Sequence, residues 1–422
     1  MRLWTVSDSV GVFQSFRTSL TGGWAARAQS RARPRPWSMI AVVATGSVLA
    51  LWIAVRTLPW FGPLVADGLR AVLGVRAVAL LEQAAAGAED RVRLVLATDR
   101  ARSLSEATPA ELARVSAPPL PVAPLGQAPT TAPPAFRPAD VGPMHAAVSS
   151  AEDGVWAPVA LRLPQPEPEP GLYRTMLHPD PRRAYAELFV FASDVETLEL
   201  HASAGSVEPK GPGKAGTGLV RPEHRERLVA AFNGGFKAEH GRYGMAVDGR
   251  VLLPPRPTSC TLARRSSGAL AIAPWPKLAR ASDELSWWRQ TPPCMLTDGE
   301  LHDGLRVEGS TGWGATIDGD TVIRRSAVGL SADGGVLFVG ISNSTTARAL
   351  AKGMQHAGAH HVAQLDVNFS YPKFVLYRPG EGGTLVALSA VKGFLFHEDD
   401  YLRRPSTRDF FYLTLRRAGS VP

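Results

Sequence analysis

Hydrophobic and polar positions divide the chain into regions with different periodicities. Between residues 62 and 96, Ala, Leu and Val recur at helical spacing, interrupted by charges such as Asp67 and Arg76. From Tyr173 onward the apolar runs are short and rich in β-branched or aromatic residues, as in YAELFVFAS, ALAIAP and GVLFVGIS. Asp-Gly pairs, which favour hairpin turns, separate these runs and begin at Asp248, Asp298, Asp303, Asp318 and Asp333.

This alternation predicts an α+β domain at residues 173–422, built on a mostly antiparallel sheet with a few packed helices. Two helices are expected. One covers Pro222–Ala231, with Pro222 near its first turn, and the other covers Thr345–Ala357, with polar SNST before it and Gly358 after it. Residues 57–116 are expected to form a helical juxtamembrane stalk.

One segment is apolar on every helical face. Trp37–Val55 contains 19 residues without a charge, and a helix of that length reaches about 28 Å, close to the hydrocarbon core of a bilayer. We expect a transmembrane anchor at residues 37–56, preceded by a basic cytoplasmic tail at residues 1–36. A cleaved signal peptide is the alternative, but no convincing cleavage site follows the apolar run.

Proline dominates residues 117–172, which we interpret as a linker. Ala117–Pro143 is nearly free of charge, and Pro164–Gly171 reads PQPEPEPG. Such segments favour extended conformations and cannot bury a core. The linker would hold the C-terminal domain away from the membrane, on its periplasmic or extracellular side.

The charge distribution supports that orientation and argues against nucleic acid as a partner. The chain carries a formal net charge of +8. Six arginines in the first 36 residues face a single acid, Asp8, which places this end in the cytoplasm by the positive-inside rule. The remainder shows no basic motif with interleaved aromatic residues.

The only two cysteines, Cys260 and Cys294, both fall in the C-terminal domain. An oxidising compartment permits a disulfide between them, and closing this loop would stabilise the domain by about 3–4 kcal/mol. Two buried free thiols are the alternative.

Candidate chemistry gathers in three motifs. AAFNGGF places Asn233, Gly234 and Gly235 after an apolar run, where a hairpin turn is the simplest explanation and a close backbone approach is another. IRRSAVGLS contains Arg325, and the segment Asp366-Val367-Asn368-Phe369-Ser370 follows a strand-like run.

In this order, the motifs resemble the phosphodiester glycosidase family, over most of residues 173–420. The matching positions are Asn233, Gly234, Gly235, Phe236, Gly244, Asp248, Gly249, Arg325, Ala327, Gly329, Gly358, Ala359, Leu365, Asp366 and Ser370. The chain departs from the family pattern where that pattern reads DGGGS, because Val367, Asn368 and Phe369 replace the three glycines. Bulky side chains there would crowd a substrate, whereas Asn368 can preserve the turn.

The resemblance implies a hydrolase that cleaves sugar-phosphodiester bonds. Asp366 would be the catalytic carboxylate, the backbone N–H groups of Gly234 and Gly235 would bind phosphate, and Arg325 would add a bidentate contact. Asn233, Asn368 and Ser370 complete the expected substrate-binding set. Alternatively, Asp366 caps a turn and Arg325 pairs with a surface acid.

His360 and His361 are weaker candidates for a base, since neighbours on a strand point to opposite faces. No Cys or His spacing indicates zinc. We expect no cofactor, although a divalent cation at Asp366 stays open. The expected partner is a carbohydrate-phosphate substrate or an envelope glycopolymer, with the membrane contacted through residues 37–56. The alternative function is a catalytically inactive glycan-binding or envelope-assembly module of the same fold.

Overall fold

The computed structural model describes residues 46–47, 50, 54, 61–106, 136–159, 171–211, 216–307, 312–313, 320–368 and 370–417. The expected basic tail lies outside these residues, as do nearly all of the expected anchor and much of the linker, so these assignments stay predictions. Among the described residues, no helix combines the length and the apolar character that crossing a membrane requires.

Two helices fall in the range for which the sequence predicts a helical stalk. Helix α2 spans Phe61–Leu73 and α3 spans Val75–Glu106. Gly74 separates them with a φ of +81°, a left-handed conformation that commonly ends a helix at glycine.

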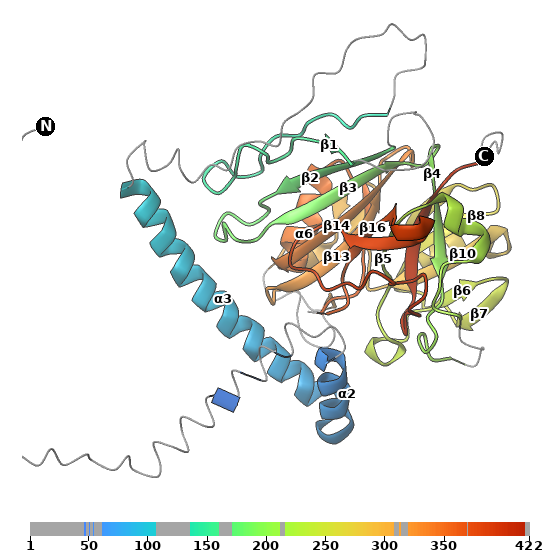
Figure 1. The fold of residues 1–422 in the computed structure, drawn as a ribbon, viewed down its shortest axis with the longest axis horizontal. Helices are drawn as coiled ribbons and strands as arrows, with labels where there is room; N and C mark the ends of the chain where they lie inside the picture. Colours follow the sequence, from blue (N-terminus) through green and yellow to red (C-terminus); the bar gives the residue numbers. More distant parts are fainter. Residues whose placement is uncertain are drawn as a thin grey trace, which may run out of the picture. The chain divides into compact units, whose positions relative to one another are not determined.

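The C-terminal region consists of three antiparallel sheets (Figure 1). The first has eight strands in the order β1 (Ala157–Pro158), β2 (Leu172–Leu177), β3 (Leu188–Asp194), β14 (Val336–Thr345), β13 (Ile323–Leu330), β15 (His361–Gln364), β11 (Leu296–Thr297) and β12 (Glu300–Leu301). The second has the order β7 (Arg250–Leu253), β6 (Met245–Val247), β10 (Leu285–Thr291), β8 (Cys260–Arg265) and β9 (Leu270–Pro274). The third has the order β17 (Leu385–Ser389), β16 (Phe374–Pro379), β5 (Leu228–Asn233), β18 (Phe410–Leu415) and β4 (Leu198–Ser203).

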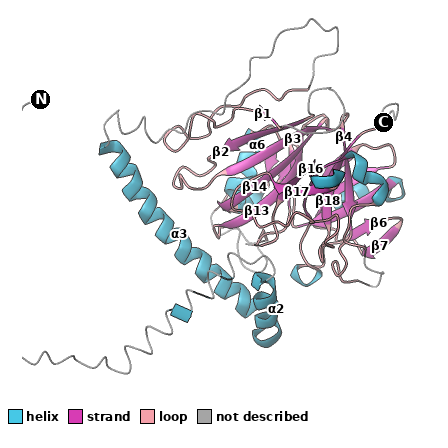
Figure 2. Ribbon diagram, viewed as in Figure 1, coloured by secondary structure: helices cyan, strands magenta, loops and turns pink. Residues whose placement is uncertain are grey.

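Helices are few and short in this region, as Figure 2 shows. The α-helices are α5 (Trp275–Leu278) and α6 (Ala347–His356), and the 3₁₀ turns are η1 (Pro222–Arg227), η2 (Ala238–His240), η3 (Ala279–Glu284), η4 (Asp303–Leu305) and η5 (Glu381–Gly383). The expectation of mostly antiparallel sheets with few helices is confirmed for this domain.

An aromatic stack joins the three sheets in one core. Phe191 of β3 lies face to face with Phe374 of β16 at 3.9 Å between ring centroids, and Phe374 stacks on Phe232 of β5 at 5.9 Å. Phe411 of β18 contacts both Phe232 and Trp287 of β10. These rings are buried and belong to one apolar cluster, and burial of this kind dominates the stability of such a fold. On another face of the eight-stranded sheet, α6 adds a second cluster.

Two of the Asp-Gly pairs form tight hairpins of the expected kind. Asp248 and Gly249 join β6 to β7 with φ of 56° and 69°, and Asp298 and Gly299 join β11 to β12 with φ of 53° and 78°. Two positive φ values identify type I′ turns. Asp333 lies in the β13–β14 connection, Asp303 begins η4 instead of turning a hairpin, and Asp318 lies outside the described residues.

The two expected helices have different outcomes. The second is α6, whose N-cap Thr346 accepts a hydrogen bond from the Ala349 N–H at 3.1 Å. The first prediction is wrong beyond Arg227, because η1 ends there and β5 begins at Leu228. Every residue of β5 is buried between β16 and β18, so sheet pairing outweighs the helix signal of Pro222.

Cys260 of β8 and Cys294 form a disulfide with an S–S distance of 1.98 Å and a Cα–Cα distance of 4.6 Å. The bond ties the second sheet to the connection that leads from β10 to β11.

Candidate functional site

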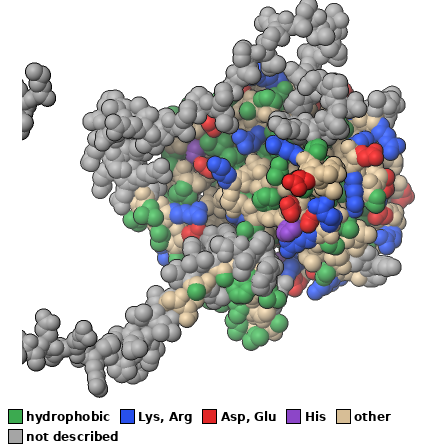
Figure 3. All heavy atoms as spheres, viewed as in Figure 1, with side chains coloured by type: hydrophobic (Ala, Val, Ile, Leu, Met, Phe, Trp, Pro, Cys, Tyr) green, Lys and Arg blue, Asp and Glu red, His purple; other side chains and the backbone are tan. Residues whose placement is uncertain are grey.

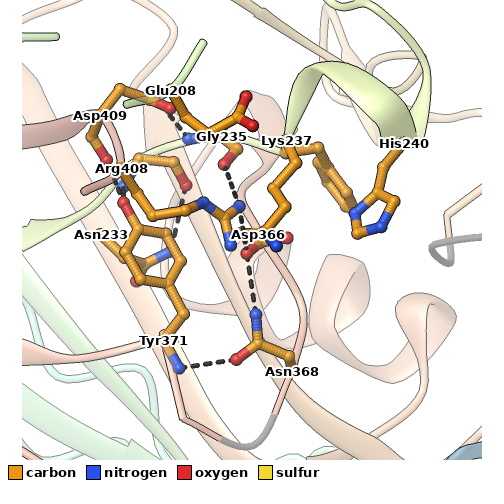
Figure 4. Close-up of polar contacts among 12 residues, drawn as sticks. Glu208, Asn233, Gly235, Lys237, His240, Asp366, Asn368, Tyr371, Arg408 and Asp409 are labelled. Atoms are coloured by element: carbon orange, nitrogen blue, oxygen red, sulfur yellow. Dashed lines mark hydrogen bonds and ion pairs between the residues drawn. The ribbon is translucent and has the colours of Figure 1, made fainter. Parts of the chain in front are cut away.

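Three segments from different parts of the sequence meet near the ends of β5, β15 and β18 (Figure 4). Asn233–Gly235 ends β5, Asp366–Tyr371 carries the chain from β15 of the eight-stranded sheet to β16 of the third sheet, and Arg408–Asp409 precedes β18. Each polar group therefore stands at the end of a buried strand, where rigid backbone can hold it in place.

The Asp366 carboxylate is buried at this site, with 2% of the residue exposed. Its Oδ2 lies 2.6 Å from Arg408 Nη2 and accepts a hydrogen bond from Asn368 Nδ2 at 2.9 Å. Burial raises the pKa of Asp366 above its usual value, and the Arg408 guanidinium opposes that effect. A carboxyl with a raised pKa, held beside a buried guanidinium, is suited to proton transfer.

Arg408 is held on three sides. Its guanidinium lies 4.2 Å above the Tyr371 ring, and Nη2 also donates to the Gly235 carbonyl at 3.1 Å. Burial works against its charge, but attraction to Asp366 and the other anionic groups nearby raises its pKa, so the guanidinium is charged. The buried Nε–H of Arg408 has no hydrogen-bond partner in the described structure, which leaves a donor for a ligand.

Tyr371 supports Arg408 and stays neutral. Its hydroxyl donates to the Asp409 carbonyl and accepts from the Gly234 N–H at 3.2 Å. Burial raises the pKa of Tyr371 far above its usual value.

The two glycines permit a close approach to Asp409 and Arg289. A Cβ on Gly234 would lie 2.2 Å from Asp409 Oδ2 and 2.4 Å from its carbonyl oxygen, and a Cβ on Gly235 would lie 2.8 Å from Arg289 Cζ. The Gly234 N–H donates to the Asp409 carbonyl at 3.1 Å, and the Gly235 N–H donates to Asp409 Oδ2 at 2.9 Å. Protein acceptors therefore occupy the two N–H groups that the sequence analysis assigned to phosphate.

Arg289 and Asp409 form a buried ion pair behind the glycines. Their side chains are 0% and 2% exposed, with Nε 2.8 Å from Asp409 Oδ2 and Nη2 3.1 Å from Oδ1. Arg289 also donates to the Phe236 carbonyl at 2.7 Å and the Tyr243 carbonyl at 2.8 Å. This pair fixes the course of the chain after Gly235.

The remaining amide and hydroxyl residues connect the segments. Asn233 Nδ2 donates to Ser326 Oγ at 2.9 Å, and Ser326 Oγ donates to the Asp366 carbonyl at 3.2 Å. Asn368 Oδ1 accepts from the N–H groups of Ser370 at 2.9 Å and Tyr371 at 2.6 Å. Asn368 thus links the backbone of Ser370 and Tyr371 to the Asp366 carboxylate.

Arg325 lies apart from this network. It is completely buried, and it donates to the carbonyls of Trp313, Thr345 at 3.1 Å and Thr321 at 3.0 Å. Its neighbour Ser326 faces Asn233, and successive side chains on a strand face opposite ways. The guanidinium beside Asp366 belongs to Arg408, whereas Arg325 was expected to contact a substrate phosphate.

The histidine candidates are also distant. His361 begins β15 and its Nδ1 accepts from the Asp298 N–H at 3.3 Å, whereas Asp366 follows the other end of that strand. Five strand-like residues span about 16 Å, so His360 and His361 cannot act with Asp366 in one reaction centre.

A further basic group lies on the η2 side of the site. In the view of Figure 4, the Lys237 side chain extends toward Asp366. Its Nζ lies 3.7 Å from Glu239 Oε1, and the side chain is 16% exposed. The buried carboxylate of Glu208 accepts from the Ala238 N–H at 2.9 Å and so fixes the turn that carries Lys237.

The sequence analysis missed Arg408, Tyr371 and Lys237. The Arg-Asp pair that precedes the apolar run FFYLTL is the one available signal, since charges at the start of a buried strand need a partner. Within the described residues, no group of three or more His, Cys, Asp or Glu side chains is placed to hold a metal ion.

No protein-family model matches the chain, and no curated protein matches it. Among solved structures, it is similar to the zebrafish N-acetylglucosamine-1-phosphodiester alpha-N-acetylglucosaminidase catalytic domain, auto-inhibited by its pro-peptide, with 15% identity, a TM-score of 0.36 and coverage of 62% of this chain and 88% of that one. A hypothetical protein from Synechocystis follows with 11% identity, a TM-score of 0.32 and coverage of 58% and 64%. At these values the relationship is distant, and it shows neither a shared activity nor a shared substrate.

Proposed function

We propose that the domain at residues 173–422 hydrolyses the bond between the anomeric carbon of a sugar and a phosphodiester oxygen. The observation that carries this proposal is the buried Asp366 carboxylate, paired with Arg408 at 2.6 Å and raised in pKa. The ordered sequence motifs that resemble the phosphodiester glycosidase family, which include this aspartate, give separate support.

The reaction requires little help at the leaving group. Water supplies an oxygen to the anomeric carbon, the bond from that carbon to the bridging oxygen breaks, and a phosphate monoester leaves with the bridging oxygen. The second ionisation of a phosphate monoester lies near a pH of about 6, so this group departs without the strong general acid that an alcohol would need.

In this proposal, the residues divide the work between the two ends of the scissile bond. Arg408 and Lys237 bind the phosphodiester and stabilise the charge that builds on it. Asp366 acts at the anomeric carbon, either by activating water or by attacking directly, while Asn368 and the Ser326 hydroxyl fix the Asp366 side chain and backbone.

The proposed setting is a membrane surface. The expected anchor at residues 37–56 and the Pro-rich linker would place the domain among periplasmic or extracellular glycopolymers and glycoconjugates. The alternative is an inactive glycan-binding or envelope-assembly module. The observation that favours it is Val367, which is only 5% exposed in the loop where the family has glycine, because its side chain fills space beside Asp366.

The test is hydrolysis of a panel of glycosyl-1-phosphate methyl diesters by the full chain and by Asp366→Asn. We expect the variant to lose about 10²–10⁴-fold in kcat, the usual contribution of a positioned acid or base, while circular dichroism shows an unchanged fold. Asp303→Asn is the matched control, since that side chain is 97% exposed. A wild-type protein that binds these diesters without turnover would establish the alternative.

A further inference from the structure

A cationic cavity lies at η2, a few residues along the chain from Gly235. It has a volume of about 430 Å³, is open to solvent, and is lined by Glu239, Gly241, Arg242, Pro254, Pro255 and Arg256. Of these residues, Glu239 is linked to the Asp366 site through its contact with Lys237 Nζ at 3.7 Å.

Both arginines of this cavity have unused guanidinium donors, although only the backbone of Arg242 and the side chain of Arg256 are fixed by contacts among the described residues. Arg242 has a φ of 50°, and its N–H donates to the Ala238 carbonyl at 2.8 Å. Its guanidinium makes no hydrogen bond or ion pair with the described residues. Arg256 lies 5.6 Å from the Tyr243 ring centroid, and one Nη donates to the Gly241 carbonyl. Its other guanidinium nitrogens have no partner among the described residues.

Glu239 is the single acid that lines the cavity, and basic side chains lie close to its carboxylate. Glu239 lies 3.7 Å from Lys237 Nζ and 3.5 Å from His240 Nε2. The two arginines therefore give the cavity a net positive charge, and open cavities lined by one sign of charge concentrate oppositely charged ligands. Guanidinium groups bind phosphate through paired N–H donors.

The cavity is close enough to Asp366 to serve one substrate molecule. The Gly235 carbonyl accepts from Arg408, and Glu239 follows Gly235 by four residues, a span of no more than about 14 Å. Lys237 lies between these two points in the chain. We propose that this cavity binds the next phosphodiester of a repeating glycosyl-1-phosphate chain. The substrate would then be an anionic polymer instead of a molecule with a single sugar-phosphodiester bond.

This inference rests on the proposed function, and two synthetic substrates separate the two claims. One is a glycosyl-1-phosphate methyl diester, and the other is a trimer with three such units. We expect wild type to favour the trimer in kcat/KM, and Arg242→Gln with Arg256→Gln to reduce the trimer value about tenfold or more, the contribution of one or two charge-assisted hydrogen bonds. The methyl diester value should stay unchanged. Added salt should reduce the trimer preference.

Arg250→Gln is the matched control, because Arg250 is an exposed arginine of the neighbouring β7 that does not line the cavity. Equal losses on both substrates, or the same loss in the control, would overturn the inference and leave the proposed function intact. If wild type hydrolyses neither substrate, the proposed function fails. Calorimetric binding of the trimer then decides the inference: binding that depends on Arg242 and Arg256 supports an anion site, and binding that does not depend on them removes it.

Discussion

Removal of Arg289 tests whether a buried ion pair holds the glycine segment in place. Arg289 makes five hydrogen bonds to the Asp409 carboxylate and to three backbone carbonyls, and it is completely buried. In Arg289→Met the volume is largely filled, but the carboxylate stays behind without its counter-ion. The carbonyls of Phe236 and Tyr243 also lose their donors.

The cost should be large. Breaking a buried pair by removal of one partner costs about 3–5 kcal/mol, because the other charge stays buried and uncompensated. For a domain of roughly 250 residues, each kcal/mol shifts Tm by about 2–4 °C, which gives a fall of about 6–20 °C.

Thermal denaturation followed by circular dichroism measures this shift. The control is Arg265→Met, since Arg265 pairs with Glu284 at 3.1 Å with side chains 36% and 68% exposed, and such surface pairs contribute about 0–1 kcal/mol. If Arg289→Met loses no more stability than Arg265→Met, the structural role given to the ion pair is refuted.

Two further predictions concern the backbone and pH. Gly234→Ala should cost about 3 kcal/mol of stability in urea denaturation, because the new Cβ overpacks against Asp409. Gly335→Ala is the control and should cost little, since the nearest atom to its new Cβ is 3.4 Å away. Similar unfolding midpoints for the two variants would contradict the close approach of Asp409. Burial, followed by repulsion from His224 and Arg264, lowers the pKa of His201 to about 2. In the unfolded chain the pKa of a histidine is near 6.5, so on acidification the unfolded state binds a proton before the folded state does. The contribution of His201 to the free energy of unfolding is therefore complete above pH 6.5. It is lost progressively below that pH, by about 2 kcal/mol at pH 5. His201→Gln should flatten this acid loss in urea denaturation at several pH values, and an unchanged profile would exclude His201 as its source.

Patterns that depend on nearby residues could be read from the sequence. The Asp-Gly hairpins at Asp248 and Asp298, the presence of α6 and the position of Asp366 just after β15 all follow from local signals. The N-cap of α6 is Thr346, one residue beyond the SNST segment that was expected to supply it. The mostly antiparallel fold follows from the same signals, because period-two runs and hairpin turns leave few other arrangements.

The rest of the site depends on contacts between distant segments. Arg408 reaches Asp366 across 42 positions of the sequence, and no local pattern announces that pairing. Arg325 matches the expected motif, but side chains alternate along β13. Ser326 therefore faces Asn233, and Arg325 points to the opposite side of the strand. A close backbone approach was one explanation for Gly234 and Gly235, but the groups that approach them, Asp409 and Arg289, could not be identified from the sequence. The residues expected to end the Pro222 helix form β5 instead, because they pair with β16 and β18.

The most direct test of the account is the fate of the solvent oxygen when a glycosyl-1-phosphate methyl diester is hydrolysed in ¹⁸O-labelled water. If Asp366 directs attack at the anomeric carbon, mass spectrometry should find methyl phosphate unlabelled and the label in the released sugar. Asp366→Asn should slow the formation of these products by about 10²–10⁴-fold. Label in the phosphate would show cleavage of the phosphorus–oxygen bond, and it would contradict a glycosidase centred on Asp366.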